Sequence, residues 1–131
     1  MIHNILISFP NQNLDVDLNL KEVKGDTIVL NVTVNDIDLS NYKIRCELTD
    51  DAQSIQLGNE EIVGSNPDIT SVEAESGMSG FQVVVPAGRT TDFKHYGTLE
   101  IEIEDEFGFI FTILQQRVTF LEENIDWQNP A

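Results

Sequence analysis

Hydrophobic and polar residues alternate along most of this chain, which is the pattern of β-strands with one buried face. The stretch 97–104 is the clearest example, because leucine and isoleucine alternate there with threonine and glutamate. A short turn, 105–108, follows. The chain then returns through Phe109, Phe111 and Ile113 on the face expected to lie in a core. The pattern predicts a β-hairpin with one buried face.

Three glutamates, Glu100, Glu102 and Glu104, share the polar face of this hairpin. Catalytic carboxylates usually converge from separate segments and are perturbed by burial or by a partner, and neither condition is visible here. We therefore expect a solvated row of acids. Two alternatives stay open. Hard cations prefer carboxylate oxygens, so Asp105 and Glu106 could form a divalent-cation site, and a glycosidase pair of carboxylates has no fixed local spacing that would reveal it.

Alternation elsewhere predicts further short strands and no sustained helix. Breakers interrupt the pattern between residues 49 and 80, where only short strands are expected. Seven or eight strands in one domain, 1–131, predict an all-β fold, an antiparallel immunoglobulin-like β-sandwich. The expected strands besides the hairpin are 14–20, 27–34, 44–48, 54–57, 69–75 and 81–85.

The composition is strongly acidic, with 23 Asp and Glu against 7 Lys and Arg and a formal net charge of −16. Such a chain repels nucleic-acid phosphate and anionic lipid, so we expect neither nucleic-acid nor membrane binding. No apolar run reaches the roughly 20 residues of a membrane-spanning helix. The amino terminus lacks the basic start of a secretory signal, which predicts synthesis in the cytoplasm.

Candidate chemistry is sparse. Cys46 is the single cysteine and alternates with Ile44 and Leu48, so we expect a buried core thiol. Asp92 and His95 lie close together in a loop, but no serine or cysteine is marked as a nucleophile beside them. Phosphate-binding loops, nucleophile elbows and zinc motifs are missing from the sequence. We therefore expect a protein without catalytic residues, metal site or cofactor.

The order of several turn and strand motifs resembles the amino-terminal domain of the upper baseplate protein of phages that infect Gram-positive bacteria. The resemblance spans 14–122, and each motif is a turn joined to a strand. Upper baseplate proteins continue into helical and receptor-facing regions, whereas this sequence ends at Ala131. The matching positions are Gly25, Asp26 and Thr27; Asp38, Leu39 and Ser40; Gly80, Phe81, Val83 and Pro86; and Gly97, Leu99 and Ile103.

This resemblance implies a bacteriophage virion protein that docks by protein–protein contacts in the tail or baseplate. Its partners would be other phage structural proteins, in an oligomeric particle assembled in the bacterial host. A capsid decoration protein or head-fibre base would fit the same sandwich. A carbohydrate-binding module that contacts the host cell wall is the alternative of another class, although few aromatic residues lie outside the expected core.

The two ends of the chain are the candidate docking elements. The amino-terminal segment 1–13 contains Ile5, Ile7 and Phe9, and Trp127 lies in the polar tail 123–131. The segment could be one more strand of the same sandwich, with Trp127 covering the core. Alternatively, the segment adds a strand to a neighbour's sheet edge, and Trp127 acts as an aromatic anchor.

Overall fold

The computed structural model describes residues 2–8, 18–59 and 68–122, and these residues form nine β-strands without a helix. The strands range from 4 to 12 residues in length, and each contains at least one β-branched residue, a type that suits a pleated, half-buried surface. Their bounds are β1 Ile2–Ser8, β2 Leu20–Val23, β3 Ile28–Asn35, β4 Lys43–Thr49, β5 Ser54–Gly58, β6 Ile69–Val72, β7 Met78–Val85, β8 Tyr96–Glu104 and β9 Ile110–Leu121.

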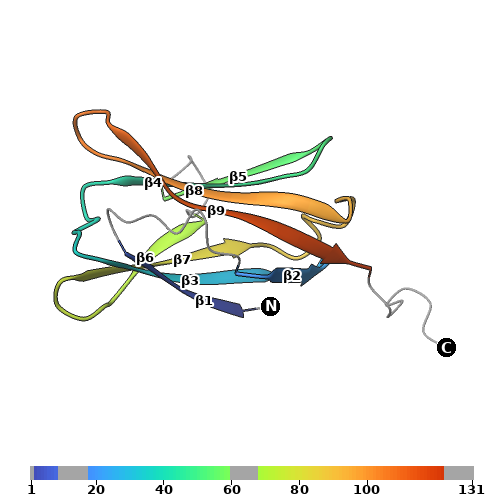
Figure 1. Cartoon of the computed structure of the whole chain (residues 1–131), viewed down its shortest axis with the longest axis horizontal. Helices are drawn as coiled ribbons and strands as arrows, with labels where there is room; N and C mark the ends of the chain where they lie inside the picture. The colour runs from blue at the N-terminus through green and yellow to red at the C-terminus, as the bar shows by residue number, and fades with distance from the viewer. Residues whose placement is uncertain (1, 9–17, 60–67, 123–131) are drawn as a thin grey trace.

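The strands form two sheets that lie one above the other (Figure 1). Sheet A has the order β1-β3-β7-β6, and sheet B has the order β2-β9-β8-β4-β5. The fold is an immunoglobulin-like β-sandwich, as the sequence predicts. The strand count is nine rather than seven or eight, and two edge pairings, β1 with β3 and β2 with β9, are parallel rather than antiparallel.

The core fills the space between the sheets with the alternate residues of each strand. In β3, Ile28, Leu30, Val32 and Val34 are all buried, and β8 buries every second residue in the same way. Burying one such aliphatic side chain contributes about 1.5–3 kcal/mol to folding, so these inward rows stabilise the packing of the two sheets. The fully buried aromatic side chains are Phe81, Phe93 and Phe120.

Two expected strands have different bounds in the structure. The strand expected at 14–20 begins only at Leu20, because Asn19 has a φ of 51°, a left-handed conformation that no extended strand contains. Residues 14–17 lie outside the described part of the chain. The strand expected at 69–75 ends at Val72, since the following residues leave the sheet to form the connection to β7.

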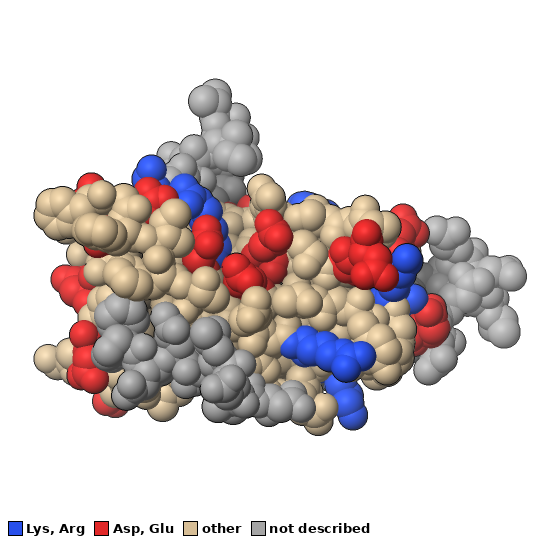
Figure 2. Space-filling model, turned by 45° about the horizontal axis from the view of Figure 1, so that its top comes forward, with Lys and Arg blue, Asp and Glu red and all other residues tan. Residues whose placement is uncertain are grey.

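The two sheets differ sharply in charge. Among the described residues, the four strands of sheet A contain no Asp, Glu, Lys or Arg. In Figure 2, which brings the top of Figure 1 forward, acidic and basic side chains lie next to one another on the upper part of the surface. The charged residues within the strands of sheet B are Lys21, Glu22, Lys43, Arg45, Glu47, Glu100, Glu102, Glu104 and Arg117.

Candidate interaction site

The connection between β8 and β9 forms a compact turn at one end of the sandwich, at the upper left of Figure 1. The Asp105 carboxylate organises this turn, because its Oδ1 accepts hydrogen bonds from the backbone N–H groups of Phe107 and Phe109, each at 2.9 Å. An aspartate that bonds backbone groups just after itself is a common device for fixing a turn. The Asp105 side chain therefore has a structural role in the turn.

Backbone contacts complete the turn. The N–H of Asp105 donates to the carbonyl of Phe109 at 3.0 Å, and the N–H of Gly108 donates to the carbonyl of Asp105 at 3.2 Å. Gly108 has a φ of 89°, a conformation that a residue with a side chain rarely adopts. Four hydrogen bonds and one left-handed glycine thus hold the turn in a defined shape.

This turn presents apolar side chains to solvent. Phe107 is 79% exposed, Phe109 is 64% exposed and Ile110 is 53% exposed. We call these three residues the hairpin tip. Phe109 was expected to lie in the core, and that expectation is wrong. Burial rises from exposed Phe109, just before β9, through half-buried Phe111 to fully buried Ile113. The core therefore ends before the hairpin does.

A β-bulge lies further along the same hairpin. The register between β8 and β9 shifts between Ile101 and Glu102, so Ile101 faces Leu114 while Glu102 faces Thr112. Ile113 is the extra residue, and both Ile113 and Leu114 are buried. The bulge shifts the alternation by one, which is why Val118 and Phe120 face inward later in the strand.

The glutamate row of β8 is half-buried and partnered rather than simply solvated. Arg45, on the neighbouring strand β4, lies with its Nη1 3.1 Å from Glu104 Oε1 and 3.8 Å from Glu102 Oε1. Glu100 Oε2 accepts a hydrogen bond from Gln115 Nε2 at 2.9 Å. The row thus belongs to the mixed-charge outer face of sheet B. Within the described residues, no group of three or more His, Cys, Asp or Glu side chains is placed to hold a metal ion.

The loop that carries Asp92 and His95 is held by structural contacts. Asp92 and His95 are both exposed, and Nδ1 of His95 lies 3.0 Å from the carbonyl oxygen of Phe120. Asp50, in the turn between β4 and β5, accepts a hydrogen bond from the Lys94 N–H at 2.8 Å. This bond and those from Ala52 and Gln53 lower the pKa of the Asp50 carboxyl. The loop is thereby fastened to sheet B.

Cys46 is a buried thiol, as the sequence predicts. Burial in the core, with a smaller contribution from the negative charge of Glu47, raises the pKa of the Cys46 thiol to about 12. A thiol in this state stays protonated at neutral pH and is a poor nucleophile.

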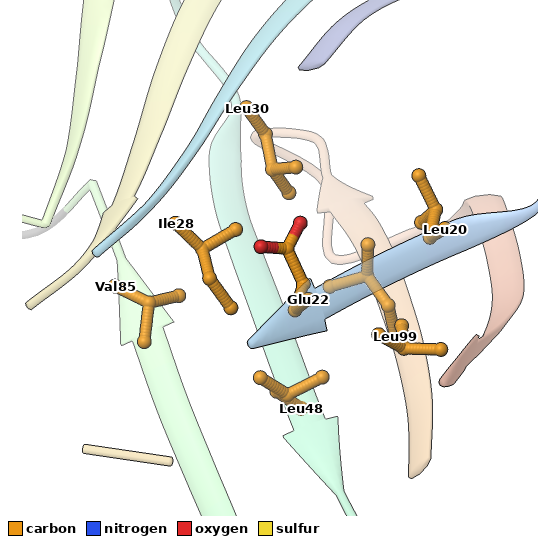
Figure 3. Close-up of a pocket in the computed structure, with 8 residues that line it drawn as sticks. Leu20, Glu22, Ile28, Leu30, Leu48, Val85 and Leu99 are labelled. Carbon is orange, nitrogen blue, oxygen red and sulfur yellow. The ribbon is translucent and has the colours of Figure 1, made fainter. Parts of the chain in front are cut away.

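Glu22 is the unexpected residue of the interior. Its carboxylate is 2% exposed and points into a small cavity whose other lining residues are all aliphatic, including Ile28, Leu30 and Leu48 (Figure 3). One oxygen pairs with Nε2 of His3, so an edge strand of sheet A is tied to an edge strand of sheet B. The cavity, about 10 Å³, has room for no more than a water molecule. The pair therefore links the sheets and has no space for a substrate.

The predicted docking residues fall on both sides of the described boundary. Ile5 and Ile7 are buried in β1, where they pack in the core of their own sandwich. Phe9 and Trp127 lie outside the described residues, so their part of the docking hypothesis stays a prediction. Sequence reasoning missed the hairpin tip, although three large apolar residues around a turn glycine, Gly108, were a usable signal.

No protein-family model and no curated protein matches the chain. Among solved structures, the chain is similar to one described as the crystal structure of the ZIG-8–RIG-5 IG1–IG1 heterodimer in a monoclinic form. The sequences are 15% identical with a TM-score of 0.45, and the match covers 86% of this chain and 89% of the other. In the described part of the protein, no helix is long and apolar enough to cross a bilayer.

Proposed function

We propose that this chain is a non-catalytic protein-interaction module that docks through the hairpin tip. The observation that supports this function most directly is the exposure of Phe107, Phe109 and Ile110 on a turn fixed by hydrogen bonds. Buried aromatic anchors contribute most of the binding energy at many interfaces. A turn that is already ordered loses little conformational entropy when it binds.

The charges around the tip define the kind of partner. Asp105 and Glu106 lie within the turn, and Glu104 precedes it directly. An apolar pocket with Lys or Arg on its rim would complement both the tip and the overall charge of −16. A phospholipid surface is disfavoured, because anionic headgroups would repel the same carboxylates.

Within this class, we place the chain among the structural proteins of a bacteriophage tail or baseplate. The support is the sequence resemblance to the amino-terminal domain of upper baseplate proteins. A capsid decoration protein or head-fibre base would use the same tip in the same way. Carbohydrate binding is the second candidate function, and the specific observation in its favour is that Phe107 and Phe109 expose aromatic rings of the kind that stack on sugars.

The test changes the tip without touching the core. The double variant Phe107→Ser/Phe109→Ser should melt within about 2 °C of the unchanged chain, since exposed side chains contribute little to stability. Leu121→Ser is the matched control, because Leu121 is also an exposed apolar residue but lies at the other end of β9. Each labelled protein is supplied during particle assembly, and incorporation is counted on particles by negative-stain microscopy.

Incorporation should fall by about 100-fold in the double variant, as expected for loss of two anchors, and should persist in the control. Equal incorporation of both variants would contradict docking through the tip. Binding of the unchanged chain to a cell-wall glycan array, lost in the double variant, would favour the carbohydrate function instead.

A further inference from the structure

The outer face of sheet A is a second surface, distinct from the hairpin tip, and its residues form rows across the strands. The register aligns Ile2 with Val29 and Val29 with Val84, which gives an apolar row. A parallel row contains Leu6, Thr33, Gly80 and Val72. Ile2 and Leu6 are more than half exposed, and Val72 is half exposed.

A row of amides runs between these two rows. The side chain of Asn31 donates from Nδ2 to Asn4 Oδ1 at 3.2 Å, and its Oδ1 accepts from Gln82 Nε2 at 2.9 Å. Thr70 of β6 extends the row, because it faces Gln82 in the register. Each amide carries both donor and acceptor atoms, so the row can bond to an identical row without adding a charge.

We propose that this uncharged outer face of sheet A pairs with the same face of a second copy of the chain. The argument is electrostatic. In the described structure, the strands of this face hold no Asp, Glu, Lys or Arg, so a charged partner would form no ion pair with them. Such a partner would bind instead at the acidic turns or at sheet B. Two copies at −16 each repel least where the fewest like charges meet, and the described strands of sheet A offer that surface.

The border of this face sets its salt dependence. A hollow at one end is lined by Glu73 and Glu75 together with Thr33, Ala74 and Met78. In a two-fold pair, the same patch of both copies forms the interface, so these glutamates add repulsion at its margin. The screening length shrinks to about 8 Å at physiological ionic strength, and added salt should therefore strengthen the pairing.

The test is the oligomeric state of the full chain in solution, measured by sedimentation velocity between about 20 and 500 mM NaCl. We expect a monomer–dimer equilibrium whose dissociation constant falls as salt rises. Thr70→Glu places a charge at an exposed position of the amide row, and we expect at least a tenfold weaker dimer from the like charges brought together. Thr98→Glu is the matched control, since it adds the same charge on the exposed face of sheet B and should change the dissociation constant less than twofold.

A cross-linking experiment keeps the test independent of how Thr70→Glu folds. Cys46 is buried and is the only cysteine of the chain, so a newly introduced surface thiol would be the accessible one. A short bismaleimide should link copies of Thr70→Cys and leave copies of Thr98→Cys, at a position that is also exposed, largely unlinked. A monomer at every salt concentration, equal weakening by both glutamates, or equal cross-linking of both cysteines would overturn the pairing through sheet A.

Discussion

Sheet A and sheet B bury similar aliphatic rows but present opposite outer faces. Sheet A carries amides, threonine and aliphatic side chains, whereas sheet B carries alternating acids and bases such as Glu102 beside Arg45. Inward alternation is required by the core, so it is common to both sheets. Outward residues are free to differ, and the contrast between them therefore carries information about contacts outside the chain.

The largest effect should come from the described hydrogen bond between His3 and Glu22, which joins the two sheets. Replacing His3 with Ala removes one hydrogen-bond partner of the buried Glu22 carboxylate, so the free energy of unfolding should fall by about 2 kcal/mol. Chemical denaturation of the unchanged chain and of the variant measures this loss. Asn4→Ala, on the exposed side of the same strand, is the control and should cost only about 0.5 kcal/mol.

A double replacement sharpens this result. His3→Leu/Glu22→Leu removes both partners and should bring the stability back to within about 1 kcal/mol of the unchanged chain, because well-packed apolar residues often replace a buried pair without loss. If His3→Ala and Asn4→Ala cost the same, the pair does not hold the sheets together.

The second prediction tests whether water is excluded from the inner face of sheet B, where Cys46 lies, as the buried residues of sheet A suggest for its own inner face. The unfolded thiol of Cys46 ionises near pH 9.0, whereas the folded pKa is raised to about 12. Between these values the unfolded state binds fewer protons than the folded state. The contribution of the protonated thiol to stability is therefore fully present below pH 9. Above pH 9, the free energy of unfolding should fall by about 1.4 kcal/mol per pH unit.

The variant Cys46→Val isolates this contribution, since valine has a similar size and no ionisable group. Denaturation at pH 8, 9 and 10 should show a steeper loss for the unchanged chain than for the variant. Parallel curves would mean that water reaches the thiol.

The third prediction uses salt to separate the two outer faces. Asn31→Ala removes two amide hydrogen bonds from sheet A and should cost about 0.5–1 kcal/mol at any salt concentration. Arg45→Gln removes the cation between Glu102 and Glu104, which should cost about 0.5 kcal/mol at low salt and close to nothing at 0.5 M NaCl. Urea denaturation of both variants at two salt concentrations measures this difference in salt dependence. An identical response of the two variants to salt would contradict the prediction.

The smallest effect concerns one charge on sheet B. Glu102→Lys places a second cation opposite Arg45, so we expect a loss of about 0.3 kcal/mol. If the glutamates had no basic partners, the same substitution would instead increase the stability of the chain. The reversed pair Arg45→Glu/Glu102→Lys should recover the loss, and a stabilised single variant would show that repulsion within the row outweighs the pairing with Arg45.

Alternation along the chain was sufficient to predict the sandwich, because inward residues such as Ile101 and Ile103 follow from the two-residue period alone. Features that depend on strand neighbours were not predictable in this way. Arg45 and Glu102 meet only because β4 pairs with β8, and His3 meets Glu22 only because the two edge strands β1 and β2 come together. Phe109 fits the apolar alternation, yet it lies beyond the end of the core.

The parallel pairing of β2 with β9 has a consequence for how the chain acquires its structure. Leu20 lies beside Val118, and the Leu18 N–H donates to Gln116 Oε1 at 2.9 Å, so the first strand of sheet B needs the last one as its neighbour. During synthesis, β2 leaves the ribosome roughly a hundred residues before that neighbour exists. Contacts this distant in sequence make folding slow, in the millisecond-to-second range typical of β-sandwiches. Sheet B therefore completes its pairing only after nearly the whole described chain has been translated.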